Sequence, residues 1–374
     1  MKSWHSETLG TRGSEGEAWK ARIFALPASD IFYAAEYLTA FEQCLPCEAR
    51  TNFGGDARLF VYGDEEDFVV HPFFKRDLQD LPFYVTASEH QKPSYDIASP
   101  YGYAGPAARV SHPHLLKGLW RNFLDCFHTF CVEEKIVAEF VRLNPFLRNH
   151  EPLSNLAGDV RESGKVVYVD LTVDKDDLWK NLQKANRNSI ARARRQKVEV
   201  SRTRKSSDLE EFFRAYNETM DRRRAKRMYY FPREFYAALF DMLGENVSLF
   251  VAKHEDRMVN ASLFVGKRTS IHYFLSGTPT ESRCPGSSNL LLYEAMLWAK
   301  NEGYETLNLG GGYSEADSLF RFKSTFSRTL ASFYTYRKVH DEARYRALCE
   351  ARDSYDRSTG RSPVESDYFP SYRR

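Results

Sequence analysis

Several features of membrane, secreted and metal-binding proteins are missing from this sequence. No run approaches the roughly 18 apolar residues of a membrane-spanning helix. The first 19 residues are polar and glycine-rich, without the apolar stretch of a secretion signal. The ten histidines show no metal-ligand spacing, so no metal site is predicted. These absences predict a globular protein that is located in the cytoplasm.

Cysteine is scarce as well, with six residues in a chain of 374, too few for a disulfide scaffold. Cys44 and Cys47 form a C-x-x-C pair, which suggests redox chemistry or half of a zinc site. No second pair completes a zinc set. The alternative is a helix end with two small, half-buried residues, so the role of the pair stays open.

Apolar and aromatic side chains are abundant. The chain is 42% apolar and contains 27 Phe and 22 Tyr, which suits β-rich cores. Its length allows two ordinary domains. Strands and helices recur in two similar rounds. We therefore predict an α/β (α+β) protein of two similar lobes, with mixed, mostly antiparallel sheets flanked by helices.

Residues 146–164 are loop-like and mark the predicted boundary between the lobes. The N-terminal lobe is predicted over residues 1–160, with 1–18 loose, and the C-terminal lobe over 161–374, with a polar tail after about residue 357. Apolar periodicity predicts strands at 19–26, 58–62, 67–74, 135–143, 166–171, 198–203, 247–253, 258–266, 270–276, 306–309 and 330–339. It predicts helices at 31–43, 112–134, 174–183, 187–196, 206–224, 232–243, 289–301 and 340–355.

Positive charge is concentrated in two segments, although the formal net charge is only +2. Residues 180–205 hold ten Lys or Arg against one acid, and residues 222–227 hold five more. Clustered cations attract phosphates and nucleic acid, whereas the simpler alternative is a solvated helix face. The candidate polyanion-binding residues are Lys184, Arg187, Arg192, Arg194 and Arg195.

A glycine run follows the predicted strand at 306–309. Gly310, Gly311 and Gly312 allow a sharp turn and the close approach of a ligand. An acidic turn comes next, and then Lys323 lies among phenylalanines, where it would present a cation at the rim of an apolar slot. We interpret this stretch as the floor and one wall of a transferase site.

Two loops add binding candidates. Tyr101 and Tyr103 lie in a segment, 96–106, that two prolines and two glycines fix as an ordered turn, either a binding loop or a packed surface loop. Arg283 and Gly286 precede a predicted helix, whose N-terminus would expose N–H groups to an anion. Their spacing resembles the pyrophosphate-binding loop of the GNAT acyltransferases.

Several segments together resemble the FemAB-like branch of the GNAT superfamily, over roughly residues 20–340. They are Leu309–Gly312, Asp317–Lys323 with Phe326, and the segments 184–193, 99–103 and 140–145. The resemblance implies two GNAT-like lobes with a cleft, and formation of an amide bond from an activated acyl or aminoacyl donor. It implies no tightly bound cofactor, with aminoacyl-tRNA or acyl-CoA as co-substrate. The long coiled-coil arm of some members is not apparent.

The resemblance also implies roles for single residues. Lys323 would lie near the reacting carbonyl, and the three glycine N–H groups would assist in stabilising the oxyanion. Asp317 would orient Lys323 or accept a proton, unless it only caps a helix at Ser318. Phe322 and Phe326 would wall the acyl end or stack a terminal base, and Asp96, Tyr101 and Tyr103 would bind the acceptor. No Cys/His or Ser/His/Asp pairing suggests a covalent acyl-enzyme.

Three functions follow. The first is transfer of an aminoacyl group from aminoacyl-tRNA to an amine of a cell-wall precursor or small biosynthetic acceptor. The second is acyl transfer from acyl-CoA or an acyl carrier to an amino sugar or similar amine. The third is a non-catalytic binding module, against which Lys323 and the glycine run argue. The acceptor, the transferred group and the oligomeric state stay open.

Overall fold

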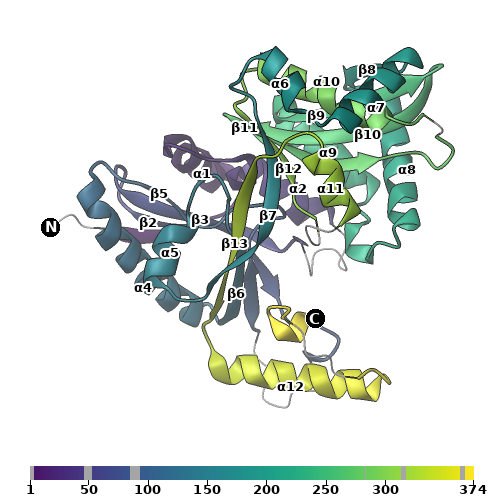
Figure 1. Cartoon of the computed structure of the whole chain (residues 1–374). Coiled ribbons are helices and arrows are strands. Elements are labelled where there is room, and N and C mark those ends of the chain that lie inside the picture. The colour runs from purple at the N-terminus through teal and green to yellow at the C-terminus, as the bar shows by residue number, and fades with distance from the viewer. Residues whose placement is uncertain (1–3, 46–52, 85–92, 283, 313–316, 363–366) are drawn as a thin grey trace. The chain divides into compact units, whose positions relative to one another are not determined.

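The computed structural model describes residues 4–45, 53–84, 93–282, 284–312, 317–362 and 367–374. The chain forms two compact units, residues 1–163 with 334–374, and residues 164–333. It passes into the second unit within β7 (Val160–Asp170) and back into the first within β13 (Leu330–Val339) (Figure 1). The predicted division had a single crossing near residue 160, whereas residues 334–374 group with the N-terminal part.

The first unit contains a mostly antiparallel sheet in the order β1-β2-β3-β4-β6-β13, with β5 beside β3. Only β4 and β6 pair in parallel among the described strands of this unit. Its strands are β1 (His5–Leu9), β2 (Asp56–Gly63), β3 (Phe68–Asp77), β4 (Tyr95–Ala98), β5 (Ala107–Arg109) and β6 (Ile136–Arg142). Its helices are α1 (Gly13–Ala25), α2 (Ala35–Cys44), α4 (Leu116–Glu133), α5 (His150–Leu156) and α12 (Glu342–Ser358).

The helix α4 covers this sheet because its apolar residues recur at helical spacing. Leu119, Phe123 and Phe127 are buried and pack with Phe60 and Phe73 of the strands. The ring centroids of Phe60 and Phe127 are 5.0 Å apart in an edge arrangement. This core confirms the helix predicted at 112–134 and the strands predicted at 58–62 and 67–74.

The prediction of a loose N-terminal segment, residues 1–18, is wrong for its described residues, 4–18. Strand β1 pairs antiparallel with β2, and α1 begins at Gly13. The helix also replaces the strand predicted at 19–26. Trp19 and Ile23, one helical turn apart, are buried together, and the Trp19 indole N–H donates to the Tyr33 carbonyl at 2.8 Å. Tertiary burial of this stripe outweighs the poor helix propensity of a glycine-rich start.

The segment after residue 357 is ordered against the first unit where the structure describes it. Tyr372 is fully buried with Tyr345 and Leu348 of α12 and with Phe83. Arg373 forms an ion pair with Asp96, at 2.5 Å between Nε and Oδ2. The polar composition of this tail did not predict the burial of Tyr372 or the buried ion pair.

Helix α5 is a second difference from the prediction, because it lies within residues 146–164, which were predicted to be a loop.

The second unit contains a sheet in the order β7-β12-β11-β10-β9-β8, in which only β11 and β12 pair in parallel among the described strands. Its remaining strands are β8 (Glu199–Thr203), β9 (Val247–His254), β10 (Arg257–Lys267), β11 (Ser270–Gly277) and β12 (Thr306–Gly310). Its helices are α6 (Lys175–Asn181), α7 (Lys184–Arg195), α8 (Ser206–Arg222), α9 (Arg233–Leu243), α10 (Ser287–Asn301) and α11 (Ser318–Ser324). The strands and helices predicted between residues 166 and 339 are confirmed.

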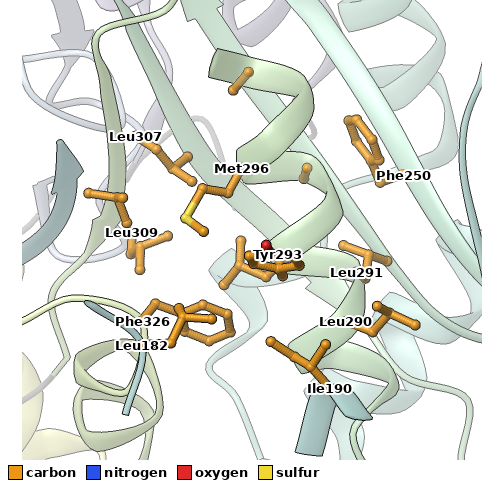
Figure 2. Packing of buried hydrophobic residues seen from close by; sticks show 14 of the residues in the cluster. Leu182, Ile190, Phe250, Leu290, Leu291, Tyr293, Met296, Leu307, Leu309 and Phe326 are labelled. Carbon is orange, nitrogen blue, oxygen red and sulfur yellow. The ribbon is translucent and has the colours of Figure 1, made fainter. Parts of the chain in front are cut away.

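The core of this unit is built around α10. Figure 2 shows Leu290, Leu291 and Met296 of that helix among side chains from β12 and from the segment before α7. Leu307 and Leu309 of β12 enter the same cluster because alternate residues of a strand share a face. The cluster therefore anchors the strand that leads into the glycine run.

The pairing of β11 with β12 ends where the glycine run begins. The last recorded partners are His272 and Asn308, and the register of β12 against β7 shifts between Asn308 and Gly310. Beyond this point, within the described residues, β11 pairs only with β10. The two parallel strands therefore separate just before the glycines, and this separation positions the candidate site.

The described residues contain neither a membrane-spanning helix nor a metal-binding cluster. None of the helices in those ranges is long and apolar enough to cross a lipid bilayer. No group of three or more His, Cys, Asp or Glu side chains there is arranged to hold a metal ion.

Candidate functional site

The glycine run and Lys323 meet in the second unit. Gly310 ends β12 with a φ of +76°, a left-handed conformation that favours glycine. Lys323 on α11 is 7% exposed, and its Nζ donates a hydrogen bond to the Gly311 carbonyl at 2.7 Å. A Cβ added at Gly310 would lie 3.2 Å from the same Nζ. The lysine and the turn predicted to form one wall are thus in direct contact.

The charge of Lys323 is tuned by its surroundings. Burial, with a smaller contribution from the nearby Arg223, lowers the pKa of the ammonium to about 8, although Asp317 opposes both effects. A buried cation near neutral pKa can stabilise negative charge and can also exchange a proton. This combination is typical of groups that act on a reacting carbonyl.

Asp317 has the capping role that the sequence left as an alternative. Its Oδ1 accepts the Leu319 N–H at 2.6 Å, at the N-terminus of α11. A Cβ at Gly312 would lie 2.7 Å from Asp317 Oδ2, so this glycine gives the carboxylate room. The same carboxylate raises the pKa of Lys323, so it also holds the ammonium charged.

The two predicted wall residues differ in burial. Phe326 is 1% exposed and belongs to the core, beside Leu182 (Figure 2). Phe322 is half-buried and packs edge-on against Phe326, with ring centroids 5.3 Å apart. Phe322 can therefore contact a ligand, whereas Phe326 supports it from within.

The sequence interpretation missed Arg223, whose charge acts on Lys323, and Tyr273, on which the same arginine acts. Arg223 is exposed at the C-terminal end of α8, and its charge acts on both Lys323 and Tyr273. Tyr273 of β11 has a pKa raised by burial, which two serine hydroxyls and Arg223 partly offset. Arg223 lies in the basic run 222–227, but nothing in that run distinguishes the member that faces the lysine.

The loop that was predicted to bind an anion leads into α10, and the start of α10 packs against α7. Arg283 lies outside the described residues, and Gly286 precedes α10 with a φ of +91°. A Cβ at Gly286 would lie 2.3 Å from the Ser189 carbonyl of α7. Asn289 in the first turn of α10 donates to Asn186 Oδ1 at 2.9 Å. The helix N-terminus therefore packs against α7.

The five predicted polyanion-binding residues separate into two groups. Arg187 donates to the carbonyls of Lys180 and Leu182, and Arg194 pairs with Glu294 at 2.8 Å. These contacts of Arg187 and Arg194 stabilise the local structure. The other three side chains, those of Lys184, Arg192 and Arg195, are exposed on α7.

Asp96, predicted to bind the acceptor, is fully buried in the first unit. It accepts from Arg76 Nε at 2.7 Å, from Arg373 Nε at 2.5 Å and from the Tyr372 hydroxyl at 3.1 Å. Burial raises the pKa of its carboxyl, but the two arginines outweigh burial and hold the pKa below its usual value. The geometry gives Asp96 a structural role between β3, β4 and the tail.

Tyr101 and Tyr103 are half-buried in the first unit. The Tyr101 ring lies 4.6 Å from that of Phe53, and the Tyr103 ring 6.3 Å from that of Phe32, both edge-on. A Cβ at Gly102, where φ is +120°, would lie 2.3 Å from the Phe32 ring. The loop is ordered by aromatic packing and keeps part of both tyrosines accessible. Cys44 is half-buried at the end of α2, and Cys47 lies outside the described residues.

Comparison with known proteins gives a family match and a fold. Residues 180–324 match the family model described as acetyltransferase (GNAT) domain. The crystal structure of FemX has 13% sequence identity and a TM-score of 0.66, over 91% of this chain and 99% of that one. The C-terminal domain of a candidate lysylphosphatidylglycerol synthetase from Agrobacterium fabrum has 16% identity and a TM-score of 0.50, over 86% and 96%. No curated relative matches the sequence.

These findings confirm the resemblance drawn from the motifs. The matched domain contains α7, the separation of β11 from β12, the glycine run and Lys323. The similarity to FemX extends over nearly the whole of both chains. Residues 180–324 thus match a GNAT acetyltransferase domain, and the chain as a whole has the fold of FemX.

Proposed function

We propose that this acyltransferase moves an aminoacyl group from aminoacyl-tRNA to the amine of a cell-wall precursor or small biosynthetic acceptor. One observation carries the proposal, namely the buried Lys323 cation held on the glycine turn by the Gly311 carbonyl. A preorganised cation in a desolvated place acts most strongly on charge that develops during the reaction. The donor is already an activated ester, so few other groups are needed.

The reaction balances with the groups at hand. The acceptor nitrogen forms a bond to the ester carbonyl carbon, and negative charge develops on the carbonyl oxygen. Lys323 has three N–H donors, of which one is given to Gly311, so another can be given to this oxyanion. The ester C–O bond then breaks, and the proton lost by the nitrogen ends on the released ribose oxygen. No covalent acyl-enzyme is required.

The exposed cations of α7 support tRNA as the donor. Lys184, Arg192 and Arg195 are exposed on this helix and can contact a phosphate backbone. The helix also packs against the start of α10, where Asn289 is bonded to Asn186 and Gly286 lies against the Ser189 carbonyl.

The fold neighbours support transfer of an amino acid. One of them is named for lysylphosphatidylglycerol, a compound in which a lysyl group is joined to a lipid. For this chain the acceptor side belongs to the first unit in our proposal, with Tyr101 and Tyr103 as contact residues. Asp96 is left out because its oxygens bond Arg76, Arg373 and Tyr372.

Transfer is tested with radiolabelled aminoacyl-tRNA and a panel of acceptors that includes UDP-linked muropeptides, amino sugars and simple amines. We expect an acceptor-dependent product that disappears after RNase treatment and in Lys323→Met. Lys175→Met, on an exposed lysine of α6, is the matched control and keeps the rate.

Two other outcomes would contradict the proposed function. An undiminished rate after RNase treatment with acetyl-CoA supplied, together with calorimetric binding of coenzyme A, would replace the tRNA donor by a thioester. Binding of tRNA and acceptor without turnover, unchanged by Lys323→Met, would leave a non-catalytic binding module.

A further inference from the structure

A buried polar pair lies directly behind the glycine turn. His272 of β11 and Asn308 of β12 are register partners where the two strands last pair. They are 3% and 2% exposed, and the Asn308 amide nitrogen lies 3.2 Å from His272 Nδ1. The amide oxygen of Asn308 accepts the Gly310 N–H at 2.8 Å. The pair thus connects β11 to the first glycine of the run.

The direction of each hydrogen bond follows from chemistry. The Gly310 N–H is a donor, so the atom of Asn308 that faces it must be the oxygen. The Asn308 NH₂ then faces His272 and needs an acceptor, which a neutral imidazole provides at Nδ1. The Gly310 N–H and the imidazole therefore both favour the same orientation of the Asn308 amide.

The glycine turn transmits this constraint to the lysine. Gly310 adopts its left-handed φ just after the bonded N–H, and Gly311 lies so close to β7 that a Cβ there would be 2.8 Å from the Lys165 carbonyl. With Asn308 bonded to Gly310 and β7 close to Gly311, the turn has little room to change the direction of the Gly311 carbonyl. Lys323 Nζ is bonded to that carbonyl at 2.7 Å.

We propose that Asn308, oriented by His272, is a positioning residue that aims the Gly311 carbonyl and so places the Lys323 ammonium. The placement itself depends only on the contacts of the second unit, whereas its effect on rate rests on the proposed function. The competing explanation is a buried polar pair that merely satisfies its own hydrogen bonds. The two explanations differ in what happens at Lys323 when the pair is changed.

The first test measures the reactivity of the Lys323 amine without any substrate. The protein is treated with an amine-reactive acylating reagent, and the labelling of each lysine is followed by peptide mass spectrometry. In Asn308→Leu we expect Lys323 to be labelled several-fold faster than in the unchanged protein. Asn308→Asp keeps an acceptor for Gly310 and for a His272 N–H, so it should restore slow labelling.

Lys253 is the internal control, because its ion pair with Asp208 lies between β9 and α8, away from the turn. Its labelling should stay constant in both variants. If Asn308→Leu speeds up Lys253 equally, that variant is globally loosened, and His272→Ala together with the Asn308→Asp rescue decides. Unchanged labelling of Lys323 in Asn308→Leu and His272→Ala, or equal acceleration in Asn308→Asp, overturns the proposal.

The second test uses the transfer assay. We expect Asn308→Leu to lower kcat on the order of tenfold to a hundredfold with little change in KM, because the misplaced group acts on the transition state. Asn308→Asp should recover most of kcat. Faster labelling of Lys323 without any loss of kcat would keep the positioning and contradict the proposed role of Lys323, so the two failures are distinguishable. A rise in KM alone would contradict positioning for catalysis.

Discussion

At the scale of single residues, the site depends on one buried ammonium. Lys323 loses solvation on α11 and gains a carbonyl at 2.7 Å and the field of Asp317. Such a group is costly to bury, so it persists where it has a task. The exposed Arg223 also acts on this ammonium and lowers its pKa.

The lowered pKa of Lys323 predicts an alkaline limb in the pH profile of transfer. The ammonium is present below its pKa of about 8 and is lost as the pH rises through that value. If the charge stabilises the oxyanion, kcat falls above about pH 8. Measurement of kcat between pH 6 and 10 checks this.

Lys323→Arg is the matched variant, because a guanidinium stays charged throughout this range. Its residual activity should show no alkaline limb near pH 8. A rate that instead rises with pH through 8 in the unchanged protein would make the neutral amine of Lys323 a general base.

At the scale of elements, the close packing of α7 on the start of α10 is the feature with the largest consequence. It depends on Gly286, whose missing side chain lets the Ser189 carbonyl approach. One glycine thus sets how closely the two helices pack.

This packing predicts unequal effects at the two ends of α10. Gly286 and Gly303 both have left-handed φ values, +91° and +88°, but only Gly286 has backbone within reach of an added Cβ. Gly303→Ala should cost about 1–2 kcal/mol of unfolding free energy through backbone strain alone. Gly286→Ala should cost clearly more, because the Ser189 carbonyl must move. Denaturant unfolding of both variants checks this, and equal losses would contradict the contact.

A second element-level feature is a buried carboxylate between two histidines in the first unit. Glu139 of β6 lies 2.7 Å from His71 Nε2 of β3 and 3.4 Å from His340 Nε2, just after β13. Burial raises the pKa of Glu139, but hydrogen bonds from the two imidazoles outweigh burial and lower it to about 2. The carboxylate therefore joins three segments that are distant in the sequence.

The lowered pKa of Glu139 predicts how stability depends on pH. A carboxyl with a pKa below its unfolded value stabilises the fold above that unfolded value, about 4.5, and loses this as pH falls toward 2. The shift corresponds to about 3 kcal/mol. Glu139→Gln should be less stable than the unchanged protein at pH 6, and the difference should shrink between pH 4.5 and 2. Denaturant unfolding across that range measures it, and a constant difference would contradict it.

At the scale of the whole molecule, the exposed cations of α7 predict salt-dependent binding of tRNA. Arg192→Glu/Arg195→Glu should weaken binding and reduce the slope of log K against log salt by about 2, one unit for each lost cation. Lys117→Glu/Arg121→Glu, on exposed residues of α4, is the matched control and should leave the slope unchanged. Filter binding at several salt concentrations measures the slopes. Equal slopes for all three proteins would remove α7 from the binding surface.

Much of the second unit was predictable because its elements carry their own signals. Alternating and helical apolar patterns are local features, and the strands and helices that they predict there are observed. The glycine run and Lys323 lie close together in the sequence, so their contact could also be expected. The start of α1 was not predictable, because Trp19 becomes helical through burial against Tyr33, which a local pattern does not show.

The sequence by itself determined the fold class, the acyltransferase motifs and the lysine, since each depends on residues close together in the chain. Only the tertiary structure decided that Asp96 is enclosed by Arg76 and Arg373, that Arg223 acts on Lys323, and that α7 covers α10. It also decided that residues 334–374 belong with the first unit. The physical reason is that burial and ion pairing join side chains by distance in space, and distant partners leave no mark in a local pattern.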